Sequence, residues 1–232
     1  MSDTNDMKKN APEKLKLTPE EASAEIARRA LARAAQMRRR IIIGIAGGPG
    51  SGKSTLAADV IGHLSDKIDG SAARIPMDGF HMKQSKLERE ELVAYKGAPQ
   101  TFEAQEFVDL LIKLKTAKSA VAAPGYSRRI EDVVPDAFTI SGNVPILIAE
   151  GNYLLLDRPP WDRITDILDL SFYIEVAPDI VRERLLKRHA EHGLFTEERN
   201  KEHIEKVDMV NYQAVANSGP RADVWIEINT KS

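Results

Sequence analysis

The stretch IIIGIAGGPGSGKSTLAADVIGHL, from Ile41 to Leu64, is the most informative segment of this chain. A run of apolar and small residues gives way to glycines, then to a lysine, two hydroxyl side chains and an apolar-periodic segment. Residues 47–54 match the pattern G-x-x-x-x-G-K-[ST] in full. Because a strand is expected before the glycines and a helix after them, the segment predicts a phosphate-binding loop rather than a chance glycine-rich turn.

The residue types of this loop fit a nucleoside triphosphate with magnesium. Glycines let successive backbone N–H groups point at phosphate oxygens, and the next helix adds the positive end of its dipole. Lys53 supplies charge for the β- and γ-phosphates, and the Ser54 hydroxyl is a natural Mg²⁺ ligand. We therefore expect ATP and Mg²⁺ as cofactors, with a nucleotide cradle made of Gly47, Gly48, Pro49, Gly50, Ser51, Gly52, Lys53, Ser54 and Thr55.

Composition excludes several classes of protein. The chain has 232 residues, a formal net charge of −2 and no cysteine. The near-neutral charge argues against a nucleic-acid or membrane-surface partner. The missing cysteines rule out disulfides and a thiol nucleophile, and they fit a reducing cytoplasm. The N-terminus lacks the apolar region of a secretory signal, and no apolar run approaches the length of a membrane helix.

Three parts are expected along the chain. Residues 1–17 are polar and predict a disordered tail. Residues 18–40 predict a helix with Thr18 as N-cap, Pro19 at its first position and Glu21 completing a capping box. The arginines at 38–40 are expected to be a solvated helix end, the alternative being a basic rim near a phosphate site. Residues 41–232 form the main domain.

Apolar strands alternate with helical patterns in that domain. This rhythm predicts an α/β fold of the P-loop NTPase type, a three-layer α/β/α arrangement with a mostly parallel sheet. The segment 122–140 breaks the rhythm and predicts an inserted hairpin. Strands are expected at 41–46, 73–77, 145–149, 170–176 and 222–228, and helices at 53–64, 84–94, 103–114, 178–191 and 197–216.

The chain lacks the motifs that are typical of other classes of P-loop protein. A guanine-reading N-K-x-D is absent, since residues 200–203 read NKEH, and the only D-x-x-G lies inside the helix after the loop. A transporter-type ATPase motif is absent too. Instead, Asp78 follows one expected strand and Glu150 ends another, at the edge where parallel sheets bind ligands. Arg184 and Arg188, four residues apart, share one helix face.

Each of these four residues has a simpler interpretation. Asp78 could cap the next helix, Glu150 could be a solvated strand end, and the two arginines could be surface charges. Gly79 after Asp78 is expected to allow a tight turn of the backbone.

In addition to the loop, the segments MDGFH, YKGAPQTFE, APGYSRRIEDVVP, ILIAEG and an arginine-rich helix occur in the order seen in one family of small-molecule kinases. The sequence resembles the uridine kinase, pantothenate kinase and phosphoribulokinase family over 41–228. The resemblance implies an ATP:alcohol phosphotransferase. KGAPQTF and PGYSRRIEDVVPD are closest to bacterial pantothenate kinase, and bacterial proteins described as fructokinase-like or uridine-kinase-like match equally well.

The resemblance also implies roles for single residues. Asp78 matches the aspartate that accepts the proton of the attacking hydroxyl, and Glu150 matches the carboxylate that holds Mg²⁺ directly or through water. Arg184 and Arg188 match the lid arginines that close on the phosphates in this family. Together with Lys53 and Asp78, they are the expected catalytic residues. The resemblance further implies that the acceptor is bound by Asp78, His81, Tyr126 and Arg128. It implies that Asn211 lies near the adenine.

Departures from the family leave the acceptor open. Asp78-Gly79-Phe80-His81 stands where uridine kinases tend to have D-S-F-Y, and Arg128 stands where pantothenate kinases carry histidine. The acceptor is therefore expected to be a small alcohol: a sugar, a nucleoside or a pantothenate-like molecule. A homodimer stays open. The rival classes are a P-loop ATPase that drives a partner, as a switch or chaperone, and a nucleotide-binding protein without catalysis.

Overall fold

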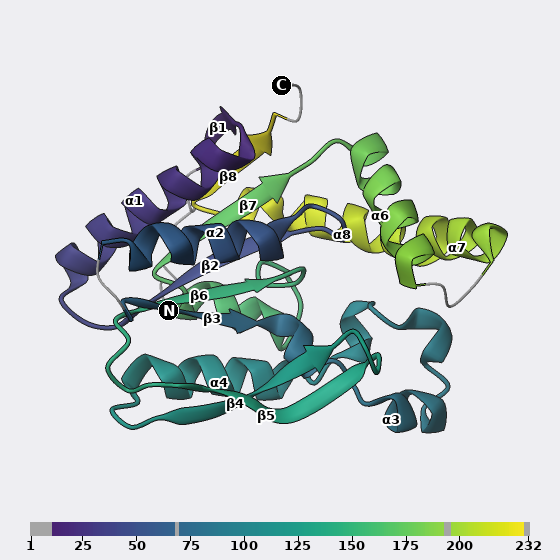
Figure 1. The fold of residues 1–232 in the computed structure, drawn as a ribbon, viewed down its shortest axis with the longest axis horizontal. Helices are drawn as coiled ribbons and strands as arrows, with labels where there is room; N and C mark the ends of the chain where they lie inside the picture. The colour runs from purple at the N-terminus through teal and green to yellow at the C-terminus, as the bar shows by residue number, and fades with distance from the viewer. Residues whose placement is uncertain (1–10, 68–69, 193–195, 230–232) are drawn as a thin grey trace, which may run out of the picture.

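The computed structural model describes residues 11–67, 70–192 and 196–229. A six-stranded parallel sheet runs through the molecule in the order β1-β8-β7-β2-β6-β3, with helices on both faces (Figure 1). A separate antiparallel pair, β4–β5, lies below it in this view. The predicted three-layer α/β/α fold with an inserted hairpin is therefore confirmed.

The strand β2 occupies the centre of the sheet between β6 and β7. All seven of its residues are buried, because each face of a parallel sheet is covered by helices. The strands are β1 (Glu13–Leu17), β2 (Ile41–Gly47), β3 (Ala72–Pro76), β4 (Val121–Ser127), β5 (Asp132–Ile140), β6 (Ile146–Gly151), β7 (Leu170–Glu175) and β8 (Val224–Ile228).

Successive residues of β2 pack into two different hydrophobic cores, one on each face of the sheet. Ile41, Ile43 and Ile45 pack with helices α1 and α2 on one face, while Ile42 and Ala46 pack with α4 and the Trp161 region on the other. The helices are α1 (Pro19–Met37), α2 (Lys53–Ser65), α3 (Gln84–Arg89), α4 (Ala104–Thr116), α5 (Ile164–Ile167), α6 (Pro178–His192), α7 (Glu197–His203) and α8 (Met209–Ser218). None of these helices is both long and apolar enough to cross a membrane.

The N-terminal part of the chain differs from its prediction. Residues 1–10 lie outside the described residues, but Glu13–Leu17 is an edge strand parallel to β8, so the expected tail to residue 17 is wrong. Its sequence EKLKL alternates, and Leu15 and Leu17 pack against the core below α1. This short amphipathic strand covers the edge of β8.

The following helix agrees with its prediction. Thr18 is the N-cap of α1, Pro19 begins the helix, and Glu21 completes the capping box. At the other end Arg40 donates to the carbonyl oxygens of Leu114, Ala117 and Val144, at the amino end of β2. The phosphate-binding loop follows the opposite end of β2. The alternative of a basic rim near the phosphates is therefore wrong. The expected solvated helix end is also wrong for Arg40, which is partly buried among these carbonyl groups.

Two predicted helices are broken. The segment expected as one helix over 197–216 consists of α7, a π-helical stretch Ile204–Asp208 and α8. The helix expected over 84–94 ends at Arg89, and a short 3-10 turn, Val93–Tyr95, follows. The π-helical stretch ends at Asp208, whose Oδ2 lies 3.0 Å from Nε2 of His189 on α6.

Candidate functional site

The phosphate-binding loop joins β2 to α2 with two glycines in the left-handed region. Gly50 has φ of 72° and Gly52, the N-cap of α2, has φ of 81°. A Cβ on Gly50 would also meet the Val181 carbonyl oxygen at 3.2 Å, since α6 packs against the loop. Both positions need glycine for their left-handed conformation, and Gly50 also needs it for this close contact. The Ser51 hydroxyl oxygen is buried with no partner in the described structure, as expected of a cradle that holds phosphate.

Lys53 and Ser54 begin α2 and face the end of β6. The Ser54 hydroxyl donates to Oε2 of Glu150 at 3.0 Å, and Glu150 is 3% exposed. Burial raises the pKa of Glu150, and the charge of Lys53 opposes that shift. Burial likewise lowers the pKa of Lys53, against the charges of Glu150 and Asp78. A solvated strand end would show neither the burial nor the coupling, so that interpretation of Glu150 is wrong.

Asp78 lies just after β3, in the 3-10 turn Met77–Phe80. The N-cap of that turn is Pro76 and the N-cap of α3 is Lys83, so Asp78 caps neither helix. Its charge lies within electrostatic reach of Lys53 and Glu150, because it affects the pKa of both. The structure therefore brings Asp78, Lys53, Ser54 and Glu150 to one edge of the sheet.

Gly79 allows a close crossing of two chain segments. A Cβ there would lie 2.3 Å from the Pro124 carbonyl oxygen of β4. The chain does turn tightly here, in the 3-10 turn Met77–Phe80, but the φ of Gly79 is not positive, so this close contact is what requires glycine. The contact brings the hairpin over the turn that carries Asp78.

An aromatic wall lines the hairpin side of the site. The His81 ring lies 4.0 Å from the Phe102 ring and 5.0 Å from the Tyr126 ring, centroid to centroid. Burial lowers the pKa of His81 to about 4, which keeps the ring neutral at pH 7. Tyr126 donates its hydroxyl to Oε2 of Glu131 at 3.0 Å, and burial raises the pKa of that hydroxyl.

Arg128 belongs to the exposed turn that follows β4. Its positive charge lowers the pKa of Lys53, so this guanidinium lies within electrostatic reach of the phosphate-binding loop. The hairpin therefore carries Tyr126 toward the aromatic wall and Arg128 toward the loop.

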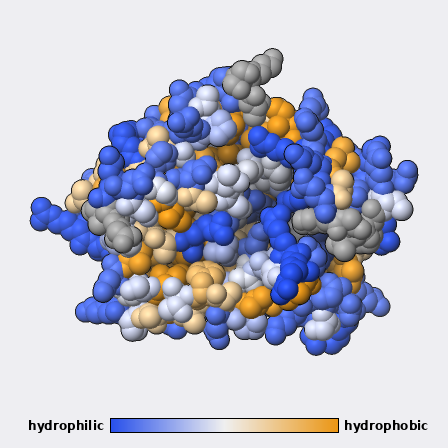
Figure 2. Space-filling view, in the orientation of Figure 1, coloured by the Kyte–Doolittle hydropathy of each residue, from blue (hydrophilic) through white to orange (hydrophobic). Residues whose placement is uncertain are grey.

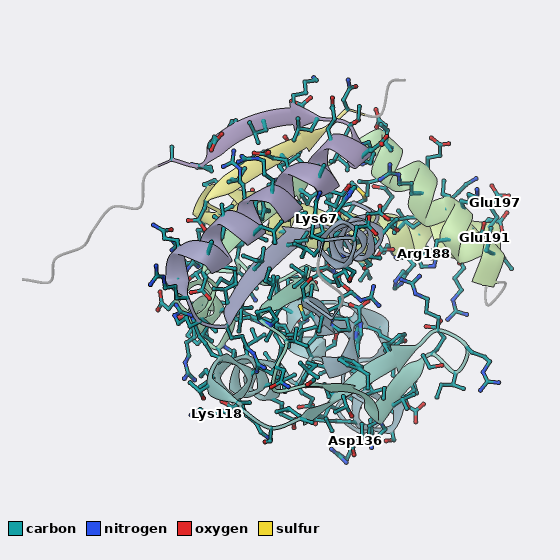
Figure 3. All side chains as sticks on the ribbon, turned by 60° about the vertical axis from the view of Figure 1, so that its left-hand side comes forward. Lys67, Lys118, Asp136, Arg188, Glu191 and Glu197 are labelled. Atoms are coloured by element: carbon teal, nitrogen blue, oxygen red, sulfur yellow. The ribbon has the colours of Figure 1, made fainter. Side chains whose placement is uncertain are left out.

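The two arginines of α6 differ from ordinary surface charges. Arg184 donates from Nη1 to the Gly50 carbonyl oxygen at 3.2 Å, so it contacts the loop directly. Arg188 points from α6 across the site toward the hairpin (Figure 3), and its charge lowers the pKa of Lys53. Both side chains are therefore brought to the candidate site.

Asn211 is buried on α8, one residue from a contact with the loop. The neighbouring Tyr212 donates its hydroxyl to the Val176 carbonyl oxygen at 2.9 Å and lies against Gly48. Asn211 is thus close in sequence to the loop contact, and its role toward adenine stays a prediction.

Three further residues of the site, Lys96, Glu131 and Asn152, are not predicted by the sequence. Lys96 donates to the Glu131 carbonyl oxygen at 2.8 Å and lies over the Tyr126 ring at 5.7 Å. Asn152 comes two residues after Glu150. Their motifs, YKGAPQTFE, SRRIED and AEGNY, were visible in the sequence, but the contacts join segments that are distant along the chain.

The surface between α6 and the β4–β5 hairpin is hollowed and bordered by hydrophilic residues (Figure 2). Within the described residues, no three His, Cys, Asp or Glu side chains gather closely enough to hold a metal by themselves. Mg²⁺ suits the oxygens of Ser54 and Glu150, because this ion usually takes one or two protein oxygens together with substrate phosphates.

Comparison of the sequence with known families gives one match over most of the chain. The model of the phosphoribulokinase/uridine kinase family matches residues 42–230. A Schizosaccharomyces pombe protein named "Putative uridine kinase C227.14" is 36% identical over 195 residues, which are 81% of this chain and 83% of the relative. A pantothenate kinase of Lacticaseibacillus casei is 30% identical over 200 residues, covering 82% of this chain and 62% of that enzyme.

Solved structures agree with this match. A Silicibacter sp. TM1040 protein described as a "putative fructose transport system kinase" has 32% identity and a TM-score of 0.80, covering 88% of this chain and 98% of that chain. YFH7 of Saccharomyces cerevisiae shares the fold, with a TM-score of 0.79 at 20% identity over 90% of this chain and 99% of that one.

Proposed function

Because the chain belongs to the phosphoribulokinase/uridine kinase family, we propose that it transfers the γ-phosphoryl group of ATP to a hydroxyl of a small metabolite. The observation that supports this most is the meeting of Asp78 with Lys53 and Glu150 beside a complete phosphate-binding loop. A loop that only binds nucleotide needs no carboxylate at the acceptor side of the site.

The nucleotide side is built for phosphate. The loop N–H groups and the start of α2 bind the phosphates, and Lys53 adds a positive charge. Ser54 and Glu150 would hold Mg²⁺, which when bound neutralises charge on the phosphate oxygens. Arg184 and Arg188 of α6 add positive charge as the transferring group gains negative charge. Asn211 is proposed to lie near the adenine.

The acceptor side supplies the base. Asp78 orients the hydroxyl and takes its proton as the hydroxyl oxygen bonds to the γ-phosphorus. The bond from that phosphorus to the β–γ bridging oxygen breaks, and ADP leaves with its electron pair. His81, Tyr126 and Arg128 are proposed to hold the acceptor so that its hydroxyl faces the γ-phosphate.

The names of relatives suggest different acceptors. They include uridine, pantothenate and fructose-related kinases, and we propose for this chain only the shared chemistry, a small alcohol. The proposal also assigns the enzyme to the cytoplasm, where ATP is available and the lack of cysteine suits a reducing compartment. A homodimer is compatible with the proposal.

The test is a coupled ADP-release assay with nucleosides, pentoses, hexoses and pantothenate. The expected result is slow ATP consumption that one acceptor class stimulates strongly, with a phosphorylated product found by mass spectrometry. ATP hydrolysis that is stimulated by a protein partner and by no small alcohol would instead support the rival partner-driven ATPase.

A further inference from the structure

The helix α6 carries both lid arginines, but its two halves are held in different ways. In the first half, Val181 and Leu185 pack against the phosphate-binding loop at Gly50. Beyond Leu186, no side chain of α6 that the structure describes belongs to a hydrophobic core. The half that carries Arg188 is therefore not fixed by apolar packing of this kind.

A hydrogen bond between His189 and Asp208 holds this second half. Nε2 of His189 lies 3.0 Å from Oδ2 of Asp208, and the imidazole donates because a carboxylate only accepts. Asp208 is 8% exposed and ends the π-helical stretch Ile204–Asp208, on which α6 packs (Figure 1). Helical irregularities of this type are frequent at functional sites. Since His189 follows Arg188 directly, the bond fixes α6 at the residue next to the arginine.

The Asp208 carboxylate does not serve as a helix cap. Asp208 is the N-cap of α8, but its side chain makes no capping hydrogen bond, and the backbone is already helical there. A second histidine lies close by, since the His203 ring is 5.6 Å from the His189 ring, centroid to centroid. Burial lowers the pKa of His203, and the charge of Asp208 opposes that shift. The carboxylate is therefore directed at the interface with α6 rather than along α8.

Arg188 depends on its helix for its position. Within the described part of the chain, its guanidinium has no hydrogen bond or ion pair. In addition to burial, its charge lowers the pKa of Lys53 on the loop and that of His203, so it is within electrostatic reach of both. Figure 3 shows it pointing from α6 across the site. A shift of this half of α6 would move the charge away from the phosphates, and a misplacement of about 1 Å can cost ~10² in rate.

We propose that Asp208 and His189 are positioning residues, whose hydrogen bond fixes the second half of α6 and so holds the Arg188 guanidinium at the phosphates of ATP. This inference rests on the proposed kinase function and adds two residues to it. Neither residue contacts the nucleotide or the acceptor, and both act through Arg188.

A double-mutant cycle tests this dependence. The readouts are kcat on the acceptor found in the ADP-release assay and the Kd for the magnesium complex of AMPPNP, a non-hydrolysable ATP analogue. We expect Asp208→Ala to lower kcat about tenfold or more and to raise the Kd about threefold or more, with the acceptor KM within about twofold. In an Arg188→Ala background, Asp208→Ala should have no further effect, because the arginine that it positions is gone.

Three results overturn the inference. The first is an Asp208→Ala protein with unchanged readouts. The second is an equal effect of Asp208→Ala in both backgrounds, which would give Asp208 a purely structural role. The third is a near-normal kcat and Kd in Arg188→Ala, which would leave no arginine to position.

Variants of His189 separate positioning from folding. His189→Leu removes the donor and should match Asp208→Ala, whereas His189→Gln places an amide N–H near the position of Nε2 and should keep kcat within about threefold of wild type. Equal losses in these two variants overturn the inference. The matched control is Glu205→Ala, which breaks the exposed Arg182–Glu205 pair between the same two segments and should leave both readouts within about twofold. Circular dichroism checks the fold of each variant.

Failure of the positioning inference and failure of the kinase proposal give different results. If no small alcohol is phosphorylated, the kinase proposal fails, and the Kd values for AMPPNP still decide whether Asp208 holds Arg188 at the phosphates. If an alcohol is phosphorylated and the cycle shows no coupling, only the positioning inference fails.

Discussion

The two sides of the site are built in different ways. The nucleotide side consists of one continuous segment, β2, the loop and α2, and much of it acts through backbone groups. The acceptor side gathers side chains from the turn after β3, the YKGAPQTF segment, the β4–β5 hairpin and the end of β6. The first side is fixed by local sequence, whereas the second depends on how distant segments pack.

This difference suggests why one side is general and the other specific. The backbone N–H groups of the loop bind the phosphates of any nucleoside triphosphate, and this requires one fixed loop conformation. The loop therefore carries no information about the acceptor. The hairpin buries Val121, Ala123 and Ile140 in the core and crosses the Asp78 turn closely at Gly79, and its exposed side chains are proposed to shape the acceptor pocket. We expect substitutions on the nucleotide side to abolish turnover, and substitutions on the acceptor side to change which alcohol is used.

Asp78→Asn should have the largest effect and tests whether the two sides meet at this residue. The change keeps the shape and removes the base, which typically costs ~10²–10⁴ in rate. ATP affinity should fall by at most about tenfold, roughly 1.4 kcal/mol, because the loop and Lys53 remain. Both quantities are measured on one preparation, with Asp109→Asn on the exposed face of α4 as control. Normal phosphotransfer would remove Asp78 from the reaction.

Lys53→Met should have the next largest effect. Lys53 gives charge where the transferring phosphoryl group gains it, and such electrostatic contributions are typically worth ~10²–10³ in rate. The protein should stay folded, since burial already disfavours the charged form of Lys53 by lowering its pKa. Steady-state kinetics and circular dichroism check both statements, with Lys113→Met on the exposed face of α4 as control. A near-normal kcat would contradict the kinase proposal.

Most of the fold could be predicted because its signals are local. The five core strands and the loop follow from apolar runs between glycines and helical periods, and each is present in the structure. The strand Glu13–Leu17 was missed, because five alternating residues in a polar segment gain their structure from pairing with β8. The π-helical stretch at Ile204–Asp208 was missed because a π-helical insertion preserves a helical pattern on either side.

The residues of the site also divide into those that local sequence predicts and those that depend on tertiary packing. The loop residues follow from one motif, and Asp78 and Glu150 follow from the rule that parallel strands bind ligands at their carboxyl ends. The partners of Tyr126 could not be predicted, since Glu131 and Lys96 meet it only after the hairpin folds over the turn at Gly79. The burial that leaves His81 neutral likewise depends on the Phe102 and Tyr126 rings.

Protonation of His81, a residue of the acceptor side, should make the free energy of unfolding depend on pH. Its folded pKa of about 4 lies below the unfolded value near 6.5, so the unfolded chain binds more protons between these values. Stability therefore rises as pH increases through this window, and it falls by up to about 3 kcal/mol as pH drops from 6.5 to 4. In His81→Gln this part of the slope should vanish. Urea unfolding at several pH values measures it, and an unchanged slope would show that His81 is not the source.

Arg128→Ala should have the smallest effect and decides to which side this residue belongs. Arg128 shares the hairpin with Tyr126, yet its charge also reaches Lys53. If it holds the acceptor equally in the ground and transition states, the KM for the acceptor rises about tenfold, roughly 1.4 kcal/mol, with little change in kcat.

The KM for ATP should then change by less than about threefold, because the loop, Lys53 and the α6 arginines still bind the phosphates. Arg129→Ala, the next residue of the same exposed turn, is the matched control for general effects on the hairpin. A rise confined to the KM for ATP would assign Arg128 to the nucleotide side. The hairpin would then contribute to both sides of the site, and Tyr126 with its Glu131 partner would carry the contact with the acceptor.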